Sequence, residues 1–472
     1  SVLAGRAVLE MAGQLRSTGD QLQKDLDGLT VPCRPWPETS AGQGYFEAHE
    51  GPFWDMGIGP IAAAGRYSES SVGDIDDVLM FTARAVGEPF RGEVLGVVGQ
   101  HPTDPSRFTV FYDPANPVTT TIESRIAEIA WFTRFNDWNN NSYPDPGEVT
   151  LHRRTFLVLP NLDMSDADIQ GLNPLEFYSA YDISVRTTQS GGSWIRTANS
   201  LEDLSRRENR IAHNVSGGHV APPTRPFPNH MWRALLVPKG TVMTPGPDGA
   251  PGLAGADDDG SGGNDDSLAE MGAFGTDDVT QPIDVVFPGS PFGETYGNDV
   301  ILSHLLAFDV KVYDPLVPVR QSNSGNDPLL PGDPGYDGSN PTAIGQGGFV
   351  DLDYARYLTA SPTSLFSGIP HARSGLRQTP YLWNTVTRAS TYDTWTLYYE
   401  HNGINEDGLL GIDQGRNSLD DNGINGIDDV LERETSPPYP VPLRGLQVRI
   451  RLLDNDTRQV RQVGVSTDFI PE

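Results

Sequence analysis

Hydrophobic positions recur with a helical period only at the start of the chain. Apolar side chains share one face there, at spacings of three, four and seven: Val8, Met11, Leu15, Leu22, Leu26 and Leu29. Charged residues fill the positions between them, and Gly28 and Pro32 end the pattern. The pattern predicts one amphipathic helix over residues 1–30, roughly 40 Å long. Its apolar stripe must pack on another element.

After Pro32 the pattern changes to short alternating or apolar runs bounded by Gly, Pro, Asn and Asp, which is typical of strands. We expect strands at residues 44–50, 77–85, 126–135, 149–159, 175–186, 300–313, 395–399, 446–453 and 460–467. The last two form the clearest hairpin, because their alternating runs are joined through Asp454, Asn455 and Asp456. Short helices are expected at 165–170 and 200–207, behind Asp or Ser caps.

Gly/Pro/Asp-rich stretches interrupt these elements and cannot bury enough apolar surface to fold alone, so we expect loops there. The predicted class is α+β, with the long N-terminal helix packed on antiparallel sheets that carry long insertions. The expected organisation is the helix at 1–30, the first part of a β-rich body at 31–239, an insertion at 240–283, a core strand region at 284–320, a loop-rich region with strands at 321–400, an acidic insertion at 401–442 and the C-terminal hairpin at 443–472.

Composition narrows the possible functions. The 472 residues include 63 Asp+Glu against 33 Lys+Arg, a net charge of -30, which repels phosphate backbones and anionic lipid surfaces. We therefore expect no nucleic-acid partner. Cys33 is the single cysteine, so no intrachain disulfide can form, and we expect it to be a buried thiol. No run of 18 apolar residues occurs, so no span across a bilayer is predicted within this sequence.

The segment 402–432 is the most informative acidic stretch. Its second half fits a 12-residue calcium loop, with oxygen ligands at positions one, five, seven, nine and twelve: Asp421, Asn425, Ile427 through its carbonyl, Asp429 and Glu432. Gly423 at position three and Asp428 at position eight depart from the usual loop, and prolines after residue 436 exclude an EF-hand exit helix. The pattern therefore favours a calcium loop without flanking helices.

A fainter copy precedes this loop, with candidate ligands Asn405, Asp407 and Asp413. We favour calcium for both copies, because carboxylates crowded this closely repel one another unless neutralised. The alternative is a solvated acidic loop, in which Asn-Gly and Asp-Gly are ordinary turn formers. For a second acidic cluster, at residues 257–266, the preference reverses to a mobile loop tip, because its spacing closes no cage.

Sequence signatures of enzymes are missing, so we predict no catalytic residue and no enzyme. The chain contains no HExxH helix, no G-x-S-x-G elbow and no Walker P-loop. His49, His152 and His304 lie on predicted strands and are expected to be structural. The scattered tryptophans are expected to be core residues rather than a sugar-stacking platform: Trp36, Trp54, Trp131, Trp138, Trp232 and Trp395.

Several stretches, in their order along the chain, resemble the J-type minor pseudopilins of type II secretion, in a large form with insertions. They are the helix ending LRSTGDQLQKDLDGL, then GYFEAHEGP, DDVLMFTAR, IAEIAWFTRF with VTLHRRTFLVLP, DVILSHLLAFDVKVYDP, and the closing hairpin. The resemblance implies a pilin-like fold and a non-enzymatic structural subunit. It also implies other pilin-like subunits as partners through the helix, and an extracytoplasmic location.

The family's cleavage site and its apolar half-helix of roughly 20 residues are not in this sequence, so the resemblance places Ser1 just downstream of them. Membrane contact is expected only through that missing segment. Calcium sites occur in several pseudopilins, which supports the acidic loop. Two other functions stay open: a secreted calcium-dependent protein that binds carbohydrate or surfaces through aromatic residues, and an uncharacterised hydrolase.

The calcium loop gives the first testable prediction. A ligand that binds only the folded state stabilises it by mass action, so EDTA should lower the melting temperature and calcium should restore it. Asp421→Ala and Glu432→Ala should each remove the calcium response. Melting curves that these substitutions leave unchanged would refute the site.

Overall fold

The structure is a computed structural model of the chain. It describes residues 2–33, 42–50, 75, 77–113, 117–135, 147, 149–171, 177–178, 180–190, 193–206, 209–211, 300–322, 327–331, 333, 336, 343–352, 390–394, 419–420, 423, 426–427, 442–454 and 459–469.

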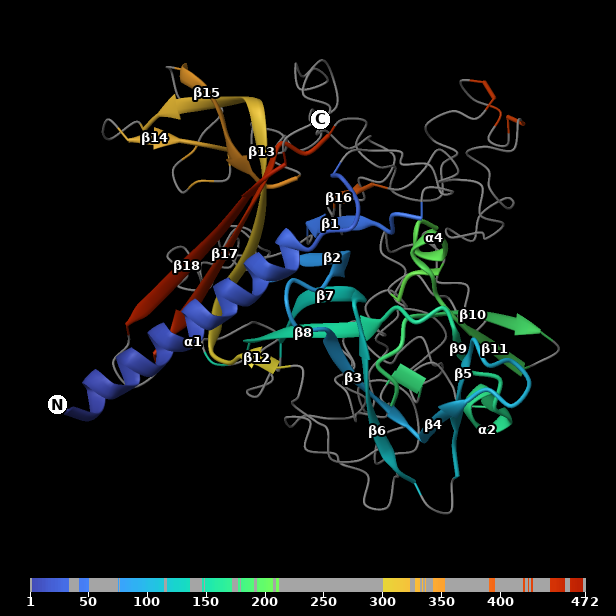
Figure 1. Cartoon of the computed structure of the whole chain (residues 1–472). Coiled ribbons are helices and arrows are strands. Elements are labelled where there is room, and N and C mark those ends of the chain that lie inside the picture. The colour runs from blue at the N-terminus through green and yellow to red at the C-terminus, as the bar shows by residue number, and fades with distance from the viewer. Residues whose placement is uncertain are drawn as a thin grey trace, which may run out of the picture.

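Helices and strands follow the order shown in Figure 1. The helices are α1 (Val2–Asp27), α2 (Ala167–Gly171) and α4 (Leu201–Leu204). The strands up to residue 200 are β1 (Phe46–Glu50), β2 (Val78–Arg84), β3 (Phe90–Leu95), β4 (Val97–Gln100), β5 (Phe108–Phe111), β6 (Thr119–Ser124), β7 (Ile126–Phe135), β8 (Val149–Leu157), β9 (Leu162–Asp163), β10 (Val185–Ser190) and β11 (Ser193–Ala198). The later strands are β12 (Val300–Leu302), β13 (Leu305–Gln321), β14 (Pro328–Leu329), β15 (Ala343–Val350), β16 (Ser390–Asp393), β17 (Gly445–Leu453) and β18 (Val460–Asp468).

Two larger sheets form the centre of the described structure. One has six strands in the order β12-β8-β7-β2-β1-β16, and the other has five, in the order β14-β13-β17-β18 with β15 also paired to β13. Smaller sheets are β4-β5-β9, β10-β11 and β3-β6. Pairing is antiparallel except between β5 and β9. Alternation along β17 buries every second side chain, as expected for a strand with one face on the core.

The two larger sheets meet at the start of β13. His304 adopts φ of 57°, a left-handed conformation that turns the chain from β12 in one sheet into β13 in the other. Asp77, just before β2, accepts a hydrogen bond from the backbone N–H of Val310 at 2.6 Å. The six-stranded sheet is thereby tied to the middle of β13. One apolar core, including Leu22, Phe81 and Ile450, continues from one sheet to the other.

The fold class predicted from the sequence is wrong. Of the described residues, 53% lie in strands and 15% in helices, so the fold is β-rich rather than α+β. The described strands form several sheets, and they are not arranged as one sheet covered by a long helix, as a pilin-like fold requires. The physical reason is that Gly-rich stretches expected to be loops pair with neighbouring strands and become strands themselves. Ala343–Val350, for example, pairs with the part of β13 that extends beyond β17.

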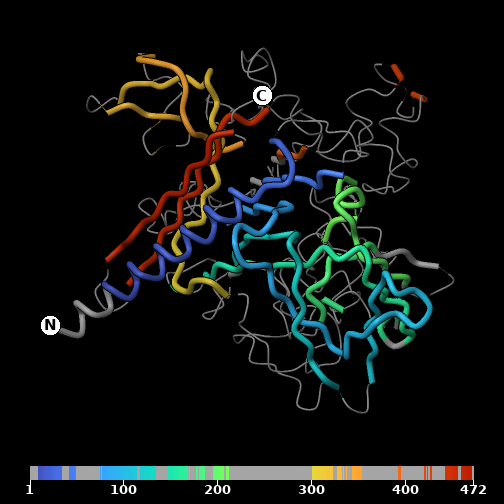
Figure 2. The backbone as a smooth tube through the Cα atoms, viewed as in Figure 1, coloured from blue at the N-terminus to red at the C-terminus, as the bar shows by residue number. Residues whose placement is uncertain are grey.

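Helix α1 contacts both of the larger sheets instead of covering a single one. Figure 2 shows it running beside the C-terminal hairpin and reaching the six-stranded sheet at its C-terminal end. A Cβ on Gly19 would lie 3.1 Å from the Val463 side chain in β18. Asp25, further along the helix, accepts hydrogen bonds from Trp131 in β7 and Arg153 in β8. The helix therefore joins the two sheets through different turns.

Several local predictions are confirmed. The strands at 44–50, 77–85, 126–135 and 149–159 correspond to β1, β2, β7 and β8, and the C-terminal hairpin is β17 and β18. The helices expected at 165–170 and 200–207 are α2 and α4. The strand expected at 175–186 is wrong, because Phe177 and Tyr178 are helical and β10 begins only at Val185. The strand expected at 395–399 lies outside the described residues.

Gly28, just after α1, and Gly13, within α1, give a matched test of packing. A Cβ on Gly28 would lie 2.3 Å from the backbone oxygen of Arg84, whereas one on the exposed Gly13 of α1 would meet nothing within 4 Å. Gly28→Ala should lower the free energy of unfolding by about 1–3 kcal/mol, because backbone must move. Gly13→Ala should raise it by about 1 kcal/mol, through helix propensity alone. Chemical denaturation measures both, and equal effects would contradict the described packing.

Candidate functional site

The calcium ligands predicted from the sequence lie almost entirely outside the described residues. Asp421, Asn425, Asp429, Glu432, Asn405, Asp407 and Asp413 are not described, nor is the second acidic cluster at 257–266. Ile427 is described and is 65% exposed. Gly423 and Gly426 have φ of 70° and 98°, so the chain turns sharply at both positions. Within the described ranges, no group of three or more His, Cys, Asp or Glu is placed to hold a metal.

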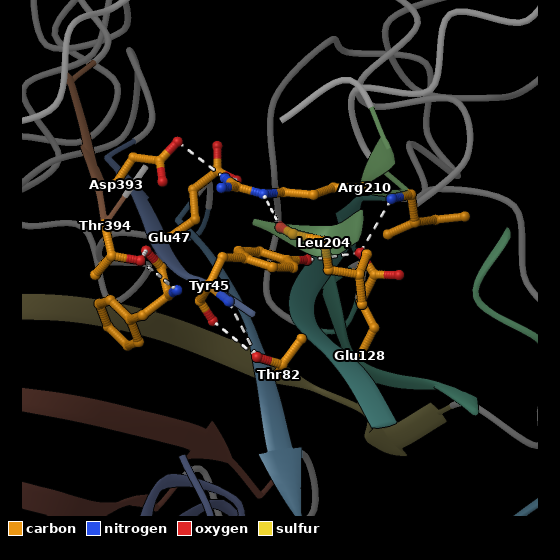
Figure 3. Close-up of polar contacts among 10 residues, drawn as sticks. Tyr45, Glu47, Thr82, Glu128, Leu204, Arg210, Asp393 and Thr394 are labelled. Atoms are coloured by element: carbon orange, nitrogen blue, oxygen red, sulfur yellow. Dashed lines mark hydrogen bonds and ion pairs between the residues drawn. The ribbon is translucent and has the colours of Figure 1, made fainter. Parts of the chain in front are cut away.

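A cluster of buried charged residues is the most distinctive site in the described structure (Figure 3). Glu47 in β1 and Asp393 in β16 are direct partners in the antiparallel register, and both are fully buried. Two carboxylates opposite each other in a sheet repel, and in a low-dielectric interior this repulsion is strong. A cation between them is therefore a condition for this pairing.

Arg210 supplies that cation. Its Nη1 donates to Glu47 Oε2 and to Asp393 Oδ2, each at 2.9 Å, and its Nε donates to the carbonyl of Leu204 at 3.1 Å. Its guanidinium carbon lies 4.0 Å from the centre of the Tyr45 ring, as in a cation–π contact. Burial lowers the pKa of Arg210, but the Asp393 and Glu47 carboxylates outweigh burial and raise that pKa overall. The guanidinium stays charged.

Glu128 in β7 forms the second half of the cluster. Its Oε1 accepts from the Tyr45 hydroxyl at 2.7 Å and from the Ile211 N–H at 3.0 Å, and its Oε2 accepts from Ser184 at 2.7 Å. Burial raises the pKa of Glu128, although these three donors act in the opposite direction. Burial, followed by the charge of Glu128, also raises the pKa of Tyr45. The Tyr45 hydroxyl therefore keeps the proton that it donates.

Short local motifs hold the segment that carries Arg210 and Ile211. Ser200 and Asp203 form a capping box at the start of α4, which fixes the helix that precedes the segment. Asn199 donates to Ser184 at 3.0 Å and to the carbonyl of Asn209 at 2.9 Å. The same hydrogen-bond network therefore reaches Glu128 through Ser184 and the Arg210 segment through Asn209.

A second buried ion pair, formed by Asp25 and Arg153, fastens α1. Arg153 donates to both oxygens of Asp25, from Nε at 2.7 Å and from Nη2 at 2.9 Å, in the forked geometry that guanidinium and carboxylate favour. Trp131 adds its indole N–H at 3.0 Å, and Gln21 donates from the previous turn at 2.9 Å. Asp25 has only 1% of its side chain exposed. This paired acid fixes the C-terminal part of the helix.

One group of residues has the composition of a catalytic triad without its geometry. His101 Nε2 lies 3.4 Å from Asp163, and Ser165 donates to the same Asp163 at 2.8 Å. The other histidine nitrogen, Nδ1, accepts from the backbone N–H groups of Thr103 and Asp104. In a working triad the histidine must lie between the serine and the acid. Here the acid lies between the other two, so no base activates the serine.

Other residues singled out in the sequence occupy structural positions. Trp131 is fully buried, as predicted for a core residue, and His152 is buried and stacked on Phe132 at 5.3 Å. Cys33 is a buried thiol, as predicted, and burial raises its pKa. His304 was expected in a strand but lies in the turn between β12 and β13. The remaining tryptophans of the expected set are outside the described residues: Trp36, Trp54, Trp138, Trp232 and Trp395.

The buried cluster was not found from the sequence. A signal was present, since Glu47 and Glu128 each interrupt an apolar strand run, in YFEAHE and IAEIAW. A charge in such a run needs a buried partner. The partners lie far away in the chain: Glu47 and Arg210 are 163 positions apart, and Arg210 and Asp393 are 183 positions apart. No local pattern could have identified them.

The arrangement can hold charges but presents none of them to a substrate. Glu47, Arg210 and Asp393 have fully buried side chains, and Tyr45 is fully buried as well. No protein-family model, no curated protein and no solved structure matches the chain. No helix among the described residues is long and apolar enough to cross a membrane. The geometry of the site is that of a buried ion-pair network, in which Arg210 links β1 to β16.

Glu128 gives a pH prediction. In the folded state the pKa of Glu128 is raised above its ordinary value of 4.5. The protonated form therefore stabilises the fold fully below pH 4.5, and this stabilisation is lost as the pH rises through the raised pKa. Glu128→Gln, which cannot ionise, should remove this loss. Glu128→Ala should cost about 1–3 kcal/mol for each buried donor left without an acceptor. Urea unfolding from pH 4 to 8 measures this, and identical pH profiles for wild type and Glu128→Gln would contradict it.

Proposed function

We propose that the chain is a non-enzymatic structural subunit of an extracytoplasmic filament or secretion pseudopilus, with α1 as its assembly element and loops stabilised by calcium. The single observation that carries this proposal is the contrast between the two ends of α1. The C-terminal end is fixed by buried charge, and the N-terminal end offers an exposed apolar side chain. A helix built in this way can join a neighbour without losing its own attachment.

The fixed end combines the Asp25–Arg153 pair with an apolar stripe. Leu15 is 4% exposed, Leu22 is fully buried and Leu26 is 3% exposed. Breaking a buried pair by removing one partner is expected to cost about 3–5 kcal/mol, because the other charge is left buried alone. The helix is therefore held to the body by far more than its intrinsic helix propensity.

The other end projects. Figure 1 shows the N-terminal turns of α1 extending past the ends of β17 and β18. Leu9 is 74% exposed, the largest exposure among the exposed apolar residues of the described structure. Leu9 is therefore one apolar side chain that another subunit could contact on this helix. This feature supports assembly through the helix with pilin-like partners, as the sequence resemblance implies.

The buried charge clusters fit a structural role better than a catalytic one. Catalytic acids and bases must reach a substrate, whereas Glu47, Arg210 and Asp393 are enclosed and neutralise one another. Calcium binding at 402–432 and the extracytoplasmic location are part of the proposal on the strength of the sequence. The EDTA experiment described above tests the first of these.

A carbohydrate-binding function receives no specific support. It needs aromatic rings gathered on one accessible face. Among the described residues, Phe108 is 48% exposed and Phe111 is 46% exposed, both on β5. They are three positions apart, so they point to opposite faces of that strand. They therefore do not form one platform.

Cysteine cross-linking tests assembly through α1. Cys33, the single cysteine of the chain, is buried, so a cysteine introduced on the surface should react in its place. Leu9→Cys, in the full-length protein in its native cells, should cross-link to a neighbouring subunit. Asp27→Cys is the matched control, because 18 residues are five helical turns and place it on the same exposed face at the fixed end.

The expected result is a cross-linked adduct from position 9 and little or none from position 27. Mass spectrometry then identifies the neighbour. Equal adducts from both positions, or none from either, would contradict assembly through the projecting end of the helix.

A further inference from the structure

Strand β18 is an open edge of the five-stranded sheet. It pairs with β17 over nine residue pairs, from Val460–Leu453 to Asp468–Gly445, without a bulge. It has no second strand neighbour within the part of the chain that the structure describes. Its described side-chain hydrogen bonds run to α1, to β17 and to Gln459. One row of its backbone N–H and C=O groups therefore faces outward.

Edge strands normally carry features that prevent pairing with other chains, such as proline, a bulge or short length. β18 lacks these three features, and its exposed charged residues are Arg461 and Asp468, near its two ends. It contains no proline, its register is regular, and Gly464 at its centre has open space around its Cβ position. Gln462 and Ser466 on either side of it are exposed. The edge is long, regular and accessible, so an extended segment can add to it.

Helix α1 forms a wall beside this edge. Gly19 lies against Val463 and Val465, and Gln23 donates to Thr467 at 3.2 Å, so α1 and β18 run in the same direction. Arg16 precedes Gly19 by about one turn, and Arg461 precedes Val463 by two residues on the same strand face. Because α1 and β18 run in the same direction, the two arginines lie near the same end of β18.

Both arginines are available to a partner. Arg16 and Arg461 are exposed, and neither forms an ion pair with any residue that the structure describes. Among the described residues, Arg461 donates to Gln459, at 3.4 Å. The sequence contains 63 Asp+Glu against 33 Lys+Arg, so a second copy offers acidic segments that complement this cationic end locally.

We infer that β18 is a strand-addition site at which an extended acidic segment of a second copy of this chain pairs with the open edge. Main-chain hydrogen bonds provide the attachment, and carboxylates near Arg16 and Arg461 fix the position of the incoming segment. The inference deepens the proposed structural role and rests on it for the expectation that copies of the chain meet. The two copies contact different surfaces, so the contact can continue from copy to copy.

Sedimentation velocity of the full chain tests this inference. Wild-type protein should self-associate as its concentration rises. The variant Arg16→Glu/Arg461→Glu should weaken this association by about tenfold or more. The control is Arg206→Glu combined with Arg91→Glu, which makes the same change in net charge at exposed arginines away from β18. Circular dichroism checks that both variants fold.

Hydrogen exchange locates the contact. Amides of residues 460–468 that do not bond to β17 should exchange more slowly at high protein concentration than at low concentration. Wild-type protein that stays monomeric would overturn the inference, and so would equal effects of the two double variants or association without protection of β18. The Leu9 cross-link distinguishes the failures, because it reports on α1 and persists if only the strand-addition site is wrong.

Discussion

The pairing of Glu47 with Asp393 is the constraint on which the β1–β16 edge of the six-stranded sheet depends. These carboxylates are register partners with no exposure to water, and the Arg210 guanidinium between them is what makes their pairing possible. Removing one member of such a group leaves a charge buried without its counterpart, which is among the most costly changes in a protein interior. The position of β16, at the sheet edge, therefore depends on a residue that belongs to no strand.

Arginine performs most of this work in the described structure, although Lys311 pairs with the buried Asp351. The 33 basic residues include only three lysines. Arg153 fastens α1 to the six-stranded sheet, Arg210 joins β1 to β16, and the buried Arg154 donates to the carbonyl of Tyr178. A planar guanidinium can serve two acceptors at once and is more weakly hydrated than an ammonium group. An acidic chain thereby neutralises selected carboxylates in its interior.

Local patterns predicted the local elements. The helical period up to Leu29, the apolar run of β7 and the alternation of the C-terminal hairpin each correspond to an observed element. The class was wrong because short strands such as β3 and β6 pair with each other, and because Ala343–Val350 becomes a strand only beside β13. The buried cluster was missed for the same reason, since its members come from distant segments. Strands and buried charges that depend on a distant partner cannot be predicted from the local sequence pattern alone.

The long separation of the cluster members also orders the folding of the chain. Strands β2, β7 and β8 lie within 80 residues of one another and can pair early, because short loops close at low entropic cost. The β1–β16 pair brings two acids together and gains its neutralising cation only after Arg210 has been placed. We therefore expect that edge of the sheet to close late, with Glu47 hydrated until Arg210 is in place.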